Sequence, residues 1–107
     1  DGKSACVLSR LFPSVTITTI DLRDDDPIFA NSYGRDNHEL RQRFLIDRNK
    51  NLAKGGNNIN FIQDNSLFLT TREIGLFDLI WLDGAHGYPV ASCDITNSIR
   101  LLSMQGI

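Results

Sequence analysis

The predicted fold depends most on one stretch of sequence, Phe77-Asp78-Leu79-Ile80-Trp81-Leu82-Asp83-Gly84-Ala85-His86-Gly87-Tyr88. Residues 77–82 are mostly apolar, and turn-forming residues follow them. A short apolar run bounded by turn signals predicts a strand buried on both faces, with Trp81 in the core of the sheet. Ligands of open α/β sheets bind beyond the carboxyl ends of the strands, so Asp83 and His86 are candidate site residues.

Two earlier segments, 15–20 and 59–63, also predict strands, and Asp21 and Asp64 follow them directly. Helices are expected over residues 5–12, 37–53 and 90–102, with a brief helix over 66–71 and a loop over 28–36. Alternating helices and strands indicate βαβ units and a parallel sheet. We therefore expect an α/β fold, a Rossmann-like three-layer sandwich with a mostly parallel sheet.

The predicted helices each carry an apolar stripe that we expect to face inward. In the first helix these residues are Val7, Leu8, Leu11 and Phe12. In the second they are Leu40, Phe44, Leu45 and Leu52. In the last they are Val90, Ile95, Ile99 and Leu102. The basic residues of the second helix are interpreted as a solvated face: Arg41, Arg43, Arg48 and Lys50.

Composition narrows the functional classes. The 107 residues are one domain's worth at most, and the formal net charge of -2 gives no basic surface for nucleic acid. No apolar run approaches the roughly 20 residues that span a bilayer, so no membrane partner is expected. Cys6 and Cys93 are interpreted as reduced thiols of a cytoplasmic protein, because two cysteines make neither a disulfide framework nor a metal knuckle.

The start of the chain has the layout of a nucleotide site. Gly2 stands where a loop turns into a helix, and Asp21 ends a strand about 20 residues later. A carboxylate at that place accepts hydrogen bonds from both hydroxyls of a ribose, although Asp21 is equally well interpreted as a solvated turn residue. The layout alone also suits a nicotinamide dinucleotide.

The ordered set of features resembles the class I S-adenosylmethionine-dependent methyltransferases. The set consists of the opening Asp-Gly turn and the strands that end at Asp21, Asp64 and Asp83. The Asp-Gly-x-His-x-Tyr sequence at residues 83–88 is similar to the small-molecule branch, which includes macrocin O-methyltransferases and cephalosporin-hydroxylase-like enzymes. The resemblance implies that residues 1–107 are part of such a domain, without its first strand and without the fifth strand onward.

The resemblance also assigns roles to individual residues. Gly2 matches the last glycine of the turn beneath the methionine part of the cofactor, and Asp21 matches the acid that holds the ribose hydroxyls. Asp64, with Asn65 beside it, matches the acid near the adenine amino group. Asp83 matches the acid that, in metal-dependent members, ligates a divalent cation such as Mg²⁺, although one carboxylate does not complete a magnesium site.

His86 is interpreted either as the general base that removes the acceptor proton or as a loop residue bonded to backbone. Asp94 then either orients His86 or simply lies near the start of its helix, and Tyr88 is expected to pack under the loop.

The predicted function is transfer of a methyl group from S-adenosylmethionine to a hydroxyl of a small molecule or sugar. Gly2, Asp21, Asp64 and Asn65 would hold the cofactor, and Asp83 and His86 would face the acceptor. Two alternatives stay open: an NAD(P)-dependent oxidoreductase domain, which the Gly2 and Asp21 layout also fits, and a non-catalytic domain that only binds a partner.

Overall fold

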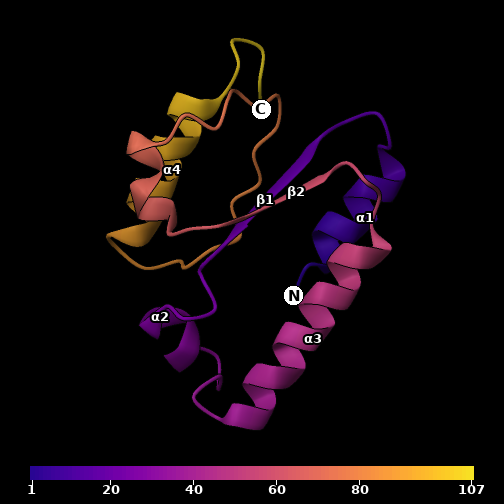
Figure 1. Ribbon diagram of the computed structural model, residues 1–107. Helices are drawn as coiled ribbons and strands as arrows, with labels where there is room; N and C mark the ends of the chain where they lie inside the picture. Colours follow the sequence, from indigo (N-terminus) through magenta and orange to yellow (C-terminus); the bar gives the residue numbers. More distant parts are fainter. The chain divides into compact units, whose positions relative to one another are not determined.

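The computed structural model describes residues 1–107, which form two units, Asp1–Asp64 and Asn65–Ile107. The N-terminal unit contains α1 (Lys3–Leu11), β1 (Ile17–Asp21), α2 (Pro27–Asn31), α3 (His38–Lys54) and β2 (Ile59–Gln63). The C-terminal unit contains the 3-10 helix η1 (Ser66–Thr71) and α4 (Val90–Leu101). The chain is therefore α/β, as predicted, with a two-stranded parallel sheet (Figure 1).

The sheet pairs β1 with β2 in parallel, with Ile17 opposite Ile59 and Asp21 opposite Gln63. The ladder is extended at both ends, because Ile17 N–H donates to the Asn58 carbonyl at 2.9 Å and Asp64 N–H donates to the Asp21 carbonyl at 2.8 Å. Parallel strands require a long crossover, and here the crossover contains α2 and α3. Both strands lie within a residue or two of their predicted bounds.

The long helix α3 confirms the helix expected over 37–53, and its ends have clear local causes. The Asn37 side chain accepts hydrogen bonds from the backbone N–H groups of Glu39 and Leu40, which caps the first turn. Glu39 lies in the first turn and Lys54 in the last, where each charge suits the helix dipole. The helix ends at Lys54, and Gly55 caps its carboxyl end through its backbone N–H.

The short helix α2 corrects the loop expected over 28–36. Asp26 accepts a hydrogen bond from Ile28 N–H at 2.7 Å, and Pro27 occupies the first helical position, where its missing N–H costs nothing. The helix carries Phe29 into the centre of the unit, where the side chain is fully buried and meets the edge of Phe44 with ring centroids 5.6 Å apart. A capping aspartate before a proline was the signal for this helix.

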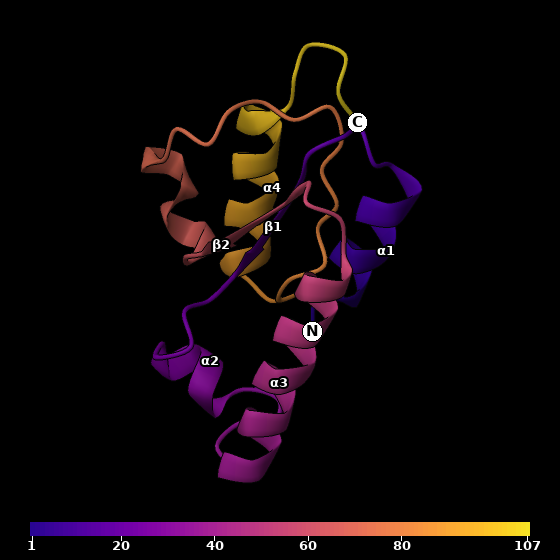
Figure 2. The same ribbon diagram turned by 45° about the vertical axis from the view of Figure 1, so that its right-hand side comes forward.

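The buried faces of the helices differ from the predicted ones. In α1 the buried residues are Ala5 and Ser9, whereas Val7, Leu11 and Phe12 are more than half exposed. Helix α1 packs against α3, and the two lie side by side in both views (Figures 1 and 2). Small residues allow that close approach, and the Ser9 hydroxyl accepts a hydrogen bond from Gly56 N–H at 2.9 Å.

The C-terminal unit confirms the brief helix over 66–71 and the helix expected over 90–102. Helix η1 packs against α4, joined by a hydrogen bond from Asn97 Nδ2 to the Ser66 carbonyl at 2.9 Å and another from Arg100 to the Leu69 carbonyl. The predicted stripe of α4 is wrong, because Ile95 and Ile99 are mostly exposed. Asn97 and Leu101 are buried instead.

The strand expected over 77–82 does not form. Phe77 makes one parallel bridge to Leu102. The next backbone hydrogen bonds of the segment are made to Ile107, by the Asp78 carbonyl and the Ile80 N–H, whereas a regular strand would use the N–H and carbonyl of Leu79. Alternate residues of a regular strand face the same neighbour, so the two pairs of bonds are out of phase and the ladder stops. Trp81 is 81% exposed and Tyr88 is also on the surface, which corrects the predictions of a core tryptophan and a packed tyrosine.

None of the helices combines the length and the apolar character that a bilayer-spanning segment requires.

Candidate cofactor site

The carboxyl ends of β1 and β2 bring two predicted site residues to one edge of the sheet. Asp21 is the last residue of β1, and Asp64 follows β2 directly. The 2.8 Å hydrogen bond from Asp64 N–H to the Asp21 carbonyl fixes the two backbones against each other. The Asp21 side chain is 35% exposed, and its Oδ1 accepts a hydrogen bond from Leu22 N–H at 2.9 Å. This carboxylate is therefore oriented by its own backbone and still reaches solvent.

Arg48 of α3 lies behind this edge and corrects the interpretation of a solvated basic face. Its side chain is only 3% exposed. Its guanidinium is surrounded by aromatic rings, at 5.1 Å from the centroid of Phe61, 5.9 Å from that of Phe29 and 6.0 Å from that of Phe44. The sequence carried a signal for this burial, because Arg48 is four residues from Phe44 on the same helix face.

The buried charge of Arg48 is shared unequally between two carboxylates. Nη2 donates to Asp24 Oδ2 at 3.1 Å, and Nη1 forms an ion pair with Asp24 Oδ1 at 2.8 Å. Asp21 is the more distant partner, with its Oδ2 at 3.7 Å from Nη1. Arg48 Nε is buried without a hydrogen-bond partner. The geometry thus makes Asp24 the principal counter-ion of Arg48.

Asp24 is held as an anion by its neighbours. The hydrogen bond from Arg48 is the largest cause that lowers the pKa of the Asp24 carboxyl below its ordinary value; the Arg48 charge and a hydrogen bond from Gln63 add to it, while partial burial opposes them. Gln63 Nε2 donates to Asp24 Oδ1 at 2.7 Å. Asp25 instead pairs with exposed Arg23, and Asp26 caps α2, so the Asp24-Asp25-Asp26 run is not a metal site.

Gly2 caps α1 with a positive φ of 74°, a conformation that favours glycine. A Cβ at this position would lie 3.2 Å from both the Arg48 carbonyl oxygen and Leu52 Cγ. The glycine is thus explained by its backbone conformation and by the close approach of α3. In nucleotide-binding turns the last glycine also allows close packing, there between a helix and a strand.

Asn65, the fourth predicted cofactor residue, begins the C-terminal unit. Its side-chain oxygen accepts a hydrogen bond from Leu67 N–H at 3.0 Å and so caps η1. The structure therefore gives Asn65 a local structural role, in a different unit from Gly2, Asp21 and Asp64.

Asp83 and His86 lie in the exposed loop that precedes α4, and neither side chain has a hydrogen-bond or ion-pair partner. Asp94 does not orient His86, because no hydrogen bond joins them. Asp94 Oδ2 lies instead against Gly84, where a Cβ would be 3.2 Å away. No group of three histidine, cysteine or acidic side chains gathers anywhere in the chain, so the residues around Asp83 do not make a metal site.

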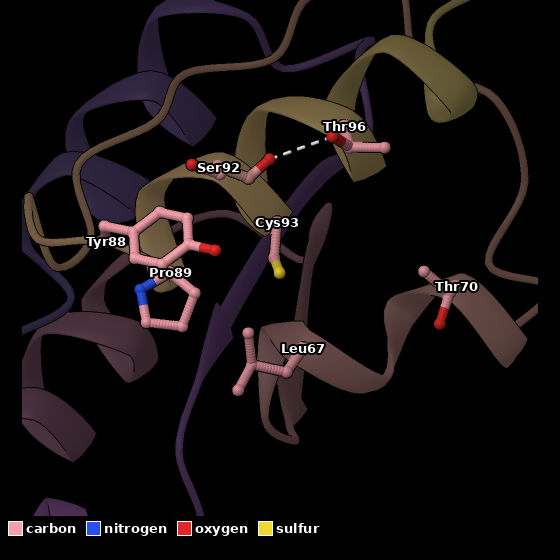
Figure 3. A pocket seen from close by; sticks show the side chains of 7 residues that line it. All are labelled: Leu67, Thr70, Tyr88, Pro89, Ser92, Cys93 and Thr96. Carbon is pink, nitrogen blue, oxygen red and sulfur yellow. Dashed lines mark hydrogen bonds between the residues drawn. The ribbon is translucent and has the colours of Figure 1, made fainter.

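The C-terminal unit also contains a cavity that sequence reasoning missed. It has a volume of about 240 Å³ and lies between η1 and the start of α4 (Figure 3). The residues that line it are uncharged: Leu67, Thr70, Tyr88, Pro89, Ser92, Cys93 and Thr96. The Cys93 thiol points from α4 toward Leu67 (Figure 3). Nothing in the spacing of these residues predicted that they would meet.

No family model, curated protein or solved structure matches the chain.

Proposed function

We propose that this chain is the cofactor-binding part of an S-adenosylmethionine-dependent methyltransferase with a Rossmann-like sandwich. The methyl acceptor is a hydroxyl of a small molecule or sugar. The observation that carries the proposal is the meeting of Asp21 and Asp64 at the carboxyl edge of a parallel pair of strands. That edge is where α/β sheets bind nucleotide-like ligands. Under the resemblance, β1 and β2 correspond to the second and third strands of a Rossmann sheet, and these two strands are neighbours in the Rossmann strand order.

Asp21 supports the proposal because its carboxylate can still accept further hydrogen bonds. One hydrogen bond from Leu22 occupies part of Oδ1, and the Arg48 guanidinium stays 3.7 Å from Oδ2. An ionised carboxylate offers about four lone-pair directions, so Asp21 can still accept from both hydroxyls of a ribose. Asp64 at the neighbouring strand end is proposed to receive the adenine amino group, and Gly2 to hold the start of α1 beside the methionine part.

The chemistry proposed for the acceptor needs few groups from the chain. S-adenosylmethionine supplies an electrophilic methyl group on a sulfonium. The chain holds the acceptor oxygen in line with that methyl group, and orientation of this kind is a large share of the catalysis. His86 is proposed to take the acceptor proton at an imidazole nitrogen, because histidine is the side chain that most often serves as a general base. Asp83 is proposed to hydrogen-bond the acceptor.

The proposal is tested by calorimetric titration of S-adenosylhomocysteine into the 107-residue chain, with NADH as a parallel ligand. We expect a dissociation constant in the micromolar range for S-adenosylhomocysteine and loss of binding in Asp21→Ala. Asp25→Ala is the matched control, because this neighbouring carboxylate is exposed and pairs only with Arg23. Binding in Asp25→Ala should be unchanged.

Other outcomes overturn the proposal in different ways. Binding of NADH instead favours the oxidoreductase alternative, since Gly2 and Asp21 also suit a dinucleotide. Binding of neither ligand favours the non-catalytic alternative. If Asp21→Ala still binds S-adenosylhomocysteine, the cofactor class is supported but the placement of the ribose at Asp21 is wrong.

A further inference from the structure

Asp24 and Asp21 compete for a single buried cation. Asp24 takes the ion pair at 2.8 Å and the hydrogen bond at 3.1 Å, while Asp21 remains at 3.7 Å. The guanidinium has donor capacity to spare, because Nε is buried without a hydrogen-bond partner. A buried charge without a counter-ion raises the free energy of the folded state, so Arg48 would turn to Asp21, the remaining carboxylate, if Asp24 released it.

We infer that Asp24 is a positioning residue that holds Arg48 away from Asp21 and thereby keeps the Asp21 carboxylate available to a ligand. The inference rests on the proposed function, in which Asp21 binds the ribose hydroxyls. An arginine that engages a carboxylate with two parallel hydrogen bonds occupies most of the acceptor capacity that the ligand needs. Asp24 prevents this engagement without touching the ligand.

Two further contacts support this arrangement, one to Asp24 and one to Arg48. Gln63, which lies opposite Asp21 in the sheet, donates to Asp24 Oδ1 at 2.7 Å and fixes the carboxylate beside β2. The ring of Phe61 lies 5.1 Å from the Arg48 guanidinium, which limits the directions in which the cation can turn. The arrangement therefore has two discrete partners for Arg48, and the charge of Asp24 selects between them.

The test compares Asp24→Asn with the matched control Asp25→Asn in the whole chain. Asn keeps the size of the side chain and its acceptor for Gln63 but loses the charge that holds Arg48. We expect the dissociation constant for S-adenosylhomocysteine to rise about tenfold in Asp24→Asn, comparable to a charged hydrogen bond, and to stay unchanged in Asp25→Asn. In an Asp21→Asn background, Asp24→Asn should have no further effect on binding, because it acts through Asp21.

A second readout needs no ligand, so it separates this inference from the proposed function. The NMR signals of the Arg48 guanidinium should respond weakly to Asp21→Asn in the natural chain and strongly in the Asp24→Asn background, where Arg48 has turned to Asp21. Strong coupling without S-adenosylhomocysteine binding in the natural chain supports the competition and overturns the proposed function. Equal, weak responses in both backgrounds overturn the inference, even where S-adenosylhomocysteine binds.

Discussion

β1 and the segment 77–82 were both predicted as strands with an aspartate at the carboxyl end, and only β1 forms a strand. β1 has a partner for each of its residues, from Ile17 opposite Ile59 to Asp21 opposite Gln63. The segment 77–82 has one regular bridge at Phe77, after which its bonds fall out of phase. The two regions differ in composition, since β1 is rich in β-branched residues and 77–82 in leucine and aromatic residues, and they also differ in their hydrogen-bonded neighbours.

The comparison shows that a strand needs a hydrogen-bonded partner as well as a suitable sequence. Apolar, β-branched side chains fit a pleated and half-buried surface, but the backbone N–H and C=O groups must also be satisfied. β1 satisfies them through β2, whereas residues 81–89 are exposed and belong to no strand or helix. The N-terminal unit is accordingly the region where single substitutions should change stability most.

The largest expected effect is at Phe29, the fully buried centre of the N-terminal unit. Phe29→Ala removes a ring that packs on Phe44 and lies beside the guanidinium groups of Arg35 and Arg48. We expect a loss of about 3–5 kcal/mol in the free energy of unfolding, because the cavity can collapse only in part. Urea unfolding followed by the helical circular dichroism signal measures it.

Phe68→Ala is the control for Phe29→Ala, because Phe68 is a mostly exposed phenylalanine of the C-terminal unit. Its effect should stay within about 0.5 kcal/mol. Equal losses of unfolding free energy in the two variants would contradict the expectation that substitutions in the N-terminal unit change stability most.

An intermediate effect is expected at Asn97, which is 2% exposed and holds η1 to α4. Asn97→Ala leaves the Ser66 carbonyl without its 2.9 Å hydrogen bond. The expected loss is about 0.5–1.5 kcal/mol, the net contribution of one part-buried hydrogen bond, measured by the same urea unfolding. Asn57→Ala is the matched control in an exposed turn, and a similar loss there would show that Asn97 contributes nothing specific.

Local signals in the sequence were enough to predict most elements. The cap at Asn37, the glycines after Lys54 and the β-branched run before Asp21 each determine a backbone conformation over a few residues. The same signals also placed Asp21 and Asp64 at the ends of strands in a parallel sheet, and the structure adds that these two strands are neighbours. Their role toward a cofactor stays a prediction, because it depends on a ligand rather than on the backbone.

The inward faces could not be predicted from the apolar pattern, because polar residues are buried in both units. Ser9, Arg48 and Asn97 are inside, each with a specific partner, while Val7, Ile95 and Ile99 are outside. A hydrophobic stripe assumes that burial follows apolar character alone, whereas a hydrogen bond or ion pair also allows a polar side chain to be buried. Arg48 was missed for this reason, and with it the competition at Asp21.

The smallest expected effect tests the comparison between β1 and 77–82 most directly. Trp81 would lie in the core if 77–82 were a buried strand, and Trp81→Ala would then cost about 3–5 kcal/mol. Because the side chain is 81% exposed, we expect a change within about 0.5 kcal/mol. The fluorescence of this single tryptophan should also be quenched by acrylamide nearly as readily in the folded chain as in urea. Protection from the quencher together with a large loss of stability would mean that 77–82 finds a strand neighbour in solution, and the two regions would then be alike.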